Sequence, residues 1–267
     1  TLGAAATING ALTLTQGDIV TTSANLLTFA TGATVSDGSN ESHLNGPEAK
    51  NTNSSAKFTF RVGNGDRWRR IGIQAAVATA ETFTVQYFFA PPEDATGSRE
   101  VSNTGDTDLN NISTNQYWTV DRSGSVNANV TLHWEDSSDG VDGNTADMRV
   151  AQWIAASSYW ESRDGSSVGS INNPGSVSSN TVSTFGTSGY FTFGSEVGDN
   201  SLPVELASFE AIGNFGSVSL SWVTSSEHEN LGFNIYRSPA AEDSWAKINA
   251  AMIDGKGTTS EETSYSF

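Results

Sequence analysis

The chain has 267 residues, which is enough for one large domain or two smaller ones that each bury a hydrophobic core. Its 13 basic residues against 30 acidic ones give a formal net charge of −17, so the chain lacks the basic surface that binding to nucleic acid or to an anionic membrane requires. No run of apolar residues approaches the roughly 20 that span a membrane, which argues against membrane insertion.

Residues 1–46 show short apolar stretches separated by turns, with a repeat of about ten residues. Apolar side chains are interleaved with polar ones at 6–14 and 26–29, and turns follow at 16–18 and near Gly32. This rhythm is typical of the coils of a β-solenoid or of the edge of a β-sandwich. We therefore expect 1–46 to form either a separate solenoid-like segment or a segment that donates a strand to another subunit.

A longer series of strands follows up to residue 195. Phe58, Phe60 and Val62 alternate with other residues, which places their side chains on one face of a strand. The other expected strands lie at 71–77, 82–89, 117–120, 129–134, 148–154, 159–162, 175–177, 182–185 and 190–193. Because no stretch long enough for a stable helix repeats its apolar residues every 3.6 positions, we expect a β-sandwich-like domain at 1–195.

A polar linker at 195–201 precedes a second series of strands. The expected strands lie at 202–206, 218–222, 233–235, 245–248 and 265–267, and apolar residues alternate with polar ones in the longer of them. The chain is therefore expected to be all-β, with a second domain at 202–267.

Three segments of this second series carry a family resemblance. They are LPVELASFEA (202–211), VSLSWVTSSEHENLGFNIYRS (218–238) and WAKINAAMIDGKGTTSEETSYSF (245–267). They resemble the fibronectin type III-like module near the C-terminus of many Bacteroidetes surface proteins, and the opening LPVEL and the W-x-T-x-S-E…N-x-G-F-x-I-x-R-S pattern are the most specific parts. The segments 8–29, 57–73, 130–138 and 147–162 resemble more loosely the β-rich region that often precedes that module.

The resemblance implies export by the type IX secretion route, a location outside the cell or on its surface, and a structural or adhesive role. It carries no catalytic site. We expect a subunit of a cell-surface fibre or filament, and the alternative is a glycan-binding accessory region of a larger secreted enzyme. An exposed row of aromatic side chains on one sheet face would favour the alternative.

The resemblance is incomplete at its C-terminal end. A fibronectin type III sandwich has seven strands, whereas five can be placed in 202–267. Either the polypeptide continues, or another chain supplies the missing strands by β-augmentation. We expect copies joined head to tail into a homopolymer, with 1–30 of one copy donating a strand to the next. The expected interface residues are Ile8, Leu12, Leu14, Leu26, Phe29, Trp222, Phe233, Ile235, Tyr265 and Phe267.

Few residues suggest chemistry. His43, His133 and His228 are far apart in the sequence without a metal-binding spacing, and His133 alternates with apolar neighbours, so it is expected on the solvent face of a strand. Glu227 and Glu229 flank His228 in what the resemblance makes a connection between strands, so they are not expected to act as paired catalytic carboxylates. We expect no enzymatic activity and no cofactor other than calcium.

Four aspartates cluster in the segment EDSSDGVDGNTAD (135–147). Calcium prefers six to eight oxygen ligands, and acidic turns that contain glycine supply them. The spacing does not match an EF-hand, so an ordinary acidic hairpin loop is the alternative. The candidate calcium ligands are Asp136, Asp139, Asp142 and Asp147.

Asn-x-Ser/Thr sequons make Asn40, Asn53, Asn111 and Asn129 candidates for surface glycosylation, although such sequons also arise by chance in a chain rich in Ser, Thr and Asn.

Arg67, Arg69 and Arg70 surround Trp68 in the densest basic cluster of the chain. The cluster is suited to an acidic glycan or an acidic neighbouring subunit, and the alternative is the start of a strand with its charges in solvent. Among the other tryptophans, Trp134, Trp153 and Trp222 alternate with apolar residues and are expected in the core, whereas Trp118 and Trp160 follow no clear pattern.

Overall fold

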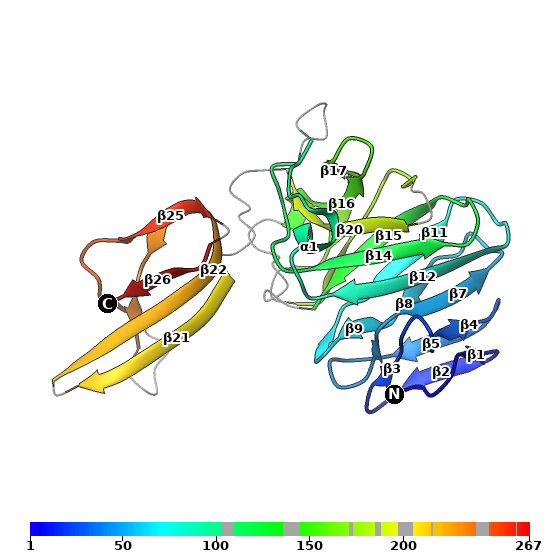
Figure 1. Cartoon of the computed structure of the whole chain (residues 1–267), viewed down its shortest axis with the longest axis horizontal. Coiled ribbons are helices and arrows are strands. Elements are labelled where there is room, and N and C mark those ends of the chain that lie inside the picture. The colour runs from blue at the N-terminus through cyan, green and yellow to red at the C-terminus, as the bar shows by residue number, and fades with distance from the viewer. Residues whose placement is uncertain are drawn as a thin grey trace. The chain divides into compact units, whose positions relative to one another are not determined.

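The computed structural model describes residues 1–102, 109–135, 145–170, 173–184, 188–196, 205–214, 216–238, 246–259 and 261–267 (Figure 1). The chain divides into two compact units, 1–200 and 201–267. Strands account for 56% of the chain and helix for 3%, which confirms the all-β prediction. The helical parts of the described residues are α1 (Glu93–Thr96) and a 3-10 turn at Thr145–Asp147. Within those residues, no helix has the length and apolar character needed to cross a membrane.

The N-terminal segment winds into coils of a parallel β-solenoid. Strand β1 (Ala6–Ile8) pairs in parallel with β4 (Leu27–Phe29), which pairs in parallel with β7 (Glu48–Thr52), so the chain returns to the same side of the coil after 21 residues. Two more parallel ladders join β2 (Ala11–Leu14) to β5 (Thr34–Asp37), and β3 (Ile19–Val20) to β6 (Leu44–Asn45) and β9 (Val62–Asn64). The buried core of these coils consists of Leu14, Leu27, Phe29, Ala33 and Leu44.

The coils continue into the larger sheet of the first unit, so 1–46 is not a separate segment. Strand β7 pairs on its other side with β12 (Glu81–Phe88) in antiparallel fashion. The resulting nine-stranded sheet has the order β1-β4-β7-β12-β14-β20-β16-β17, with β13 paired to β20. Its remaining strands are β13 (Asn111–Ile112), β14 (Tyr117–Arg122), β16 (Met148–Ile154), β17 (Tyr159–Ser162) and β20 (Ser188–Ser195).

A five-stranded sheet packs against the larger one. Its order is β18-β19-β15-β11-β8, from β8 (Phe58–Phe60), β11 (Ile71–Ala75), β15 (Ala128–Trp134), β18 (Ser166–Val168) and β19 (Gly175–Ser178), while β10 (Arg67–Trp68) pairs with β9. Buried and partly buried residues alternate along β12, as expected for a strand with one face on the core. Trp118 and Trp134 meet the ring of Phe193 edge to face, at centroid distances of 5.4 and 6.0 Å, so both tryptophans belong to the core.

The second unit is built around one long strand, β22 (Ser217–Phe233). Its first part pairs with β21 (Glu205–Asn214) and β26 (Thr263–Ser266), and its second part pairs with β25 (Ile253–Thr259). A short hairpin of β23 (Tyr236–Arg237) and β24 (Ala246–Lys247) follows. The stretch around Glu227, expected as a connection between strands, is therefore part of a continuous strand with irregular register.

Candidate interaction surface

The register of the second unit separates apolar from polar side chains. Phe209, Trp222 and Tyr265 lie side by side across β21, β22 and β26. Because side chains alternate along a strand, the same face carries the residues two positions away. We call Leu206, Phe209, Val218, Leu220, Trp222, Tyr265 and Phe267 the apolar face, and Ser208, Glu210, Ile212, Ser219, Ser221, Val223, Ser264 and Ser266 the serine face.

One end of the apolar face is covered by its own chain. The ring of Trp222 stacks on Tyr265 at 5.5 Å and meets the edge of Phe233 at 5.3 Å. Trp222 is only 3% exposed, as expected for a core residue. Trp222 is also among the expected interface residues, and it is not available to another chain, because the far end of β22 brings Phe233 onto it.

The β21 side of the apolar face, and the end of that face at Val218, are bare. Phe209, Val218 and Phe267 are 55%, 59% and 45% exposed, and Leu206 is 53% exposed. Among the strands that the structure describes, β21 and β26 each pair with β22 alone, so each leaves one backbone edge open. Unpaired edges and bare apolar surface are both unfavourable in water, and together they mark a surface suited to another chain.

A buried carboxylate holds the bend of β22. Glu227 is 2% exposed, and it accepts hydrogen bonds from the Thr224 hydroxyl, the Asn230 amide, the Lys256 backbone N–H and the Tyr265 hydroxyl. Burial raises the pKa of Glu227, but the hydrogen bonds outweigh it and leave the pKa below its usual value. The four donors stabilise the charged form of this carboxylate in its buried position. The side chains of His228 and Glu229 lie outside the described residues.

The expected donor segment is part of its own unit. Phe29 is fully buried and Leu14 is 5% exposed in the core of the coils, and Ile8 and Leu12 pack against that core. Leu26 is half-buried. Donation of 1–30 to another subunit would remove this core from the first unit, so the segment is not a free donor strand.

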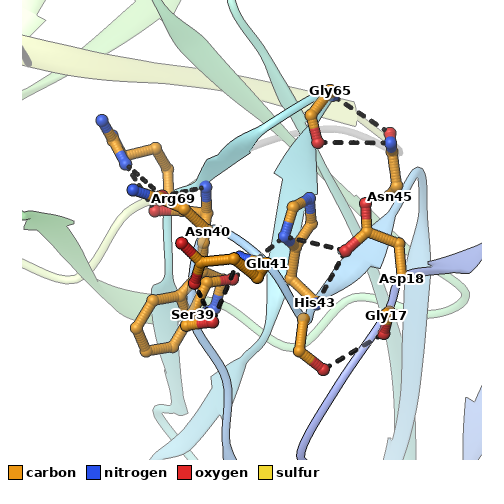
Figure 2. Close-up of polar contacts among 11 residues, drawn as sticks. Gly17, Asp18, Ser39, Asn40, Glu41, His43, Asn45, Gly65 and Arg69 are labelled. Carbon is orange, nitrogen blue, oxygen red and sulfur yellow. Dashed lines mark hydrogen bonds and ion pairs between the residues drawn. The ribbon is translucent and has the colours of Figure 1, made fainter.

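A polar cluster joins the coils at the turn 39–43 (Figure 2). The backbone N–H of His43 donates to the Asp18 carboxylate at 3.2 Å, and its ring Nδ1 lies 3.1 Å from the carbonyl oxygen of Ser39 and 3.3 Å from the same carboxylate. The ring is fully buried, and a Cβ at Gly63 would clash with it. An enclosed imidazole of this kind supports packing between coils and offers no route for a substrate.

The structure gives each arginine of the expected basic cluster a partner within the chain. Arg69 is 2% exposed and donates to the Trp68 carbonyl oxygen at 2.7 Å and to the Asn40 side chain at 3.4 Å. Arg70 pairs with Glu135 at 2.9 Å, and Arg67 lies 3.8 Å above the ring of Phe89. The strand-start interpretation holds in part, because Arg67 begins β10, but Arg69 is buried and not in solvent. Binding of an acidic ligand by the cluster stays a prediction.

His133 does not lie on an open solvent face. It is half-buried, and burial, followed by the charges of Arg70, Lys57 and Arg61, lowers the pKa of His133 to about 3. The ring is therefore neutral at physiological pH.

The calcium prediction stays open. Asp136, Asp139 and Asp142 lie outside the described residues, and Asp147 ends the 3-10 turn at 145–147. In the described part of the chain, no group of three or more His, Cys, Asp or Glu residues is placed to hold a metal ion.

The four sequons differ in accessibility. Asn53 is exposed, and Asn40 is exposed with its side-chain oxygen accepting from the Trp68 N–H at 3.0 Å. Asn129 is half-buried and donates its amide to the carbonyl oxygen of Ser179 at 3.0 Å. Asn111 is 6% exposed, so the prediction of a surface glycan is wrong there for the folded protein.

Comparison of the chain with protein-family models, with curated proteins and with solved structures finds no match.

Proposed function

We propose that the chain is a structural or adhesive extracellular protein that assembles into a fibre through β-strand addition between copies at the second unit. The observation that carries the proposal is the bare part of the apolar face, along β21 and at Val218 and Phe267, beside two open strand edges. The sequence resemblance of 202–267 to a module of exported surface proteins supports the extracellular location. The role is mechanical and requires no catalytic step.

Two different open edges make propagation feasible. Contact of the β21 edge of one copy with the β26 edge of the next is heterologous, and heterologous contacts repeat into open filaments. Each added strand satisfies backbone N–H and C=O groups that an edge leaves unpaired. The exposed rings and methyl groups of the apolar face then come together, and each Å² removed from water stabilises the assembly by about 25 cal/mol.

The test compares two faces of the same strands. Phe209→Ser combined with Val218→Ser removes apolar surface from the apolar face, and Ile212→Ser removes a side chain of similar exposure (51%) from the serine face of β21. Sedimentation velocity and electron microscopy of the whole chain should show assemblies for the native protein and the Ile212→Ser variant. The double variant should remain a 28.1 kDa monomer.

A native protein that stays monomeric at every concentration reached would contradict the proposal. So would equal loss of assembly in the double variant and in the Ile212→Ser control.

A further inference from the structure

The outer face of the nine-stranded sheet combines aromatic rings with polar side chains across β12, β14 and β20, which lie side by side (Figure 1). The residues of β12 that alternate with its core residues point outward, and they include Gln86 and Phe88. The register places Phe88 opposite Tyr117, and Gln86 opposite Thr119. Thr119 in turn lies opposite Tyr190 of β20.

Three rings form an angled aromatic group on this face. Phe88 and Tyr117 are stacked, with centroids 4.7 Å apart and an angle of 9° between the rings. Tyr190 lies 6.3 Å from Tyr117 and is tilted by 52° to it. Phe88 and Tyr190 are half-buried and reach the surface, whereas Tyr117 is 7% exposed and holds the two rings in place by packing.

Polar groups beside the rings are unengaged. Within the described residues, the side chains of Gln86, Thr119 and Asp121 have no hydrogen-bond partner, and neither do the hydroxyl groups of Tyr117 and Tyr190. A surface built only to pack against an apolar partner would leave such groups unsatisfied on binding, at a cost of about 1–3 kcal/mol each. Their positions therefore favour a ligand that is itself rich in hydroxyl groups.

The charge of this face restricts the ligand further. Asp121 lies on the face, and Asp94 of α1 is close enough that its charge, after burial, helps to raise the pKa of Tyr117. The outward positions of β12, β14 and β20 around the rings carry no Lys or Arg. Acidic ligands are therefore disfavoured.

We propose that this face, formed by Gln86, Phe88, Tyr117, Thr119, Asp121 and Tyr190, binds an uncharged glycan. The C–H face of a hexopyranose ring packs on the aromatic group, and the sugar hydroxyls bond to the amide, hydroxyl and carboxylate groups beside it. The site belongs to the first unit, so it is independent of assembly through the second.

The test uses two adjacent phenylalanines. Phe88→Ala removes a ring of the proposed site, whereas Phe89→Ala removes the next ring along the chain, which is 39% exposed and lies under Arg67 instead. Gln86→Ala is a second site variant that leaves the aromatic packing intact. The probes are neutral oligosaccharides of glucose, mannose, xylose and galactose, with polygalacturonate as the acidic probe, measured by calorimetry on the whole chain.

At least one neutral oligosaccharide should bind, and binding should weaken about tenfold in both Phe88→Ala and Gln86→Ala while Phe89→Ala binds as the native chain does. Polygalacturonate should bind more weakly than the best neutral probe. The proposal is overturned by lack of binding to every neutral probe, by tighter binding of polygalacturonate, or by native affinity in Gln86→Ala. If Phe88→Ala does not fold, Gln86→Ala and Asp121→Asn decide the question in the same way.

Discussion

Two buried carboxylates of the first unit are in opposite protonation states at neutral pH. Glu48 is fully buried, accepts one hydrogen bond from the Arg61 backbone N–H, and has no partner for its second oxygen within the described residues. Burial raises the pKa of Glu48 to about 8 against the opposing effects of Arg61 and Lys50. Glu81 accepts from the hydroxyl of Ser123 and from three backbone N–H groups, and these outweigh burial and lower the pKa of Glu81. The number of donors thus decides the protonation state.

Glu48 should make the first unit less stable as pH rises. Its pKa in the folded protein is above its usual value of 4.5, so the folded state binds the proton more tightly. The stability from the protonated group is fully present below about pH 4.5 and is lost as pH rises to about 8. Glu48→Gln keeps the shape of the side chain but cannot ionise. The melting temperature of the variant should therefore not fall as pH rises through this range. Melting temperatures that change by the same amount with pH in the native protein and in the Glu48→Gln variant would contradict the interpretation.

Residues of the W-x-T-x-S-E…N-x-G-F pattern in the second unit stabilise the bend of β22. Thr224, Glu227 and Asn230 of β22 form one hydrogen-bonded group with β25 and β26. Gly232 has φ at +151°, and a Cβ there would clash with the backbone of Ile253. The specific pattern seen in the sequence therefore has a structural explanation within this unit.

Glu227→Gln should destabilise the second unit at neutral pH by about 1–3 kcal/mol, because an amide cannot accept from all four donors and the Tyr265 hydroxyl loses a charged partner. The pKa of Glu227 is lowered in the folded state, so its contribution is present above its usual pKa and is lost as pH falls through the folded value. The difference in unfolding free energy between native protein and variant should therefore shrink in acid. Glu261→Gln, at an exposed carboxylate of the same unit, is the matched control and should melt as the native protein does.

Local patterns predicted the strands but not their partners. Alternation identified β12, β15 and the first half of β22, and the ten-residue rhythm of 1–46 indicated either a solenoid or the edge of a sandwich. The parallel pairing joins Ala6 to Leu27, which is 21 positions further along the chain. The alternation of apolar and polar residues within one strand does not reveal which distant strand it will pair with. The burial of Arg69 was not predicted for the same reason: its side-chain partner Asn40 is 29 positions away in the sequence.

At the scale of the whole molecule, the sequence predicted an uncovered sandwich face, and of the residues expected on it Phe267 is exposed whereas Trp222 is buried. Trp222 is an expected interface residue because the missing strands of the sandwich would leave part of its core face uncovered. The bend of β22 covers it with Phe233 and leaves Phe209 and Val218 bare instead. A change of direction within one strand is a tertiary effect, fixed here by the buried group around Glu227. The aromatic face of the first unit was missed because Phe88, Tyr117 and Tyr190 come together only through the pairing of three strands.

The net charge of −17 makes a final prediction about assembly. Copies of the chain repel one another, and salt screens that repulsion, since the Debye length falls from about 10 Å at 0.1 M to about 3 Å at 1 M. If apolar contacts join the copies, raising the concentration of sodium chloride should strengthen the association measured by sedimentation. The Ile212→Ser control should respond like the native protein, and the Phe209→Ser and Val218→Ser double variant should stay monomeric at every salt concentration. Association that weakens with salt would instead show that ion pairs hold the copies together, and the apolar face would lose its assigned role.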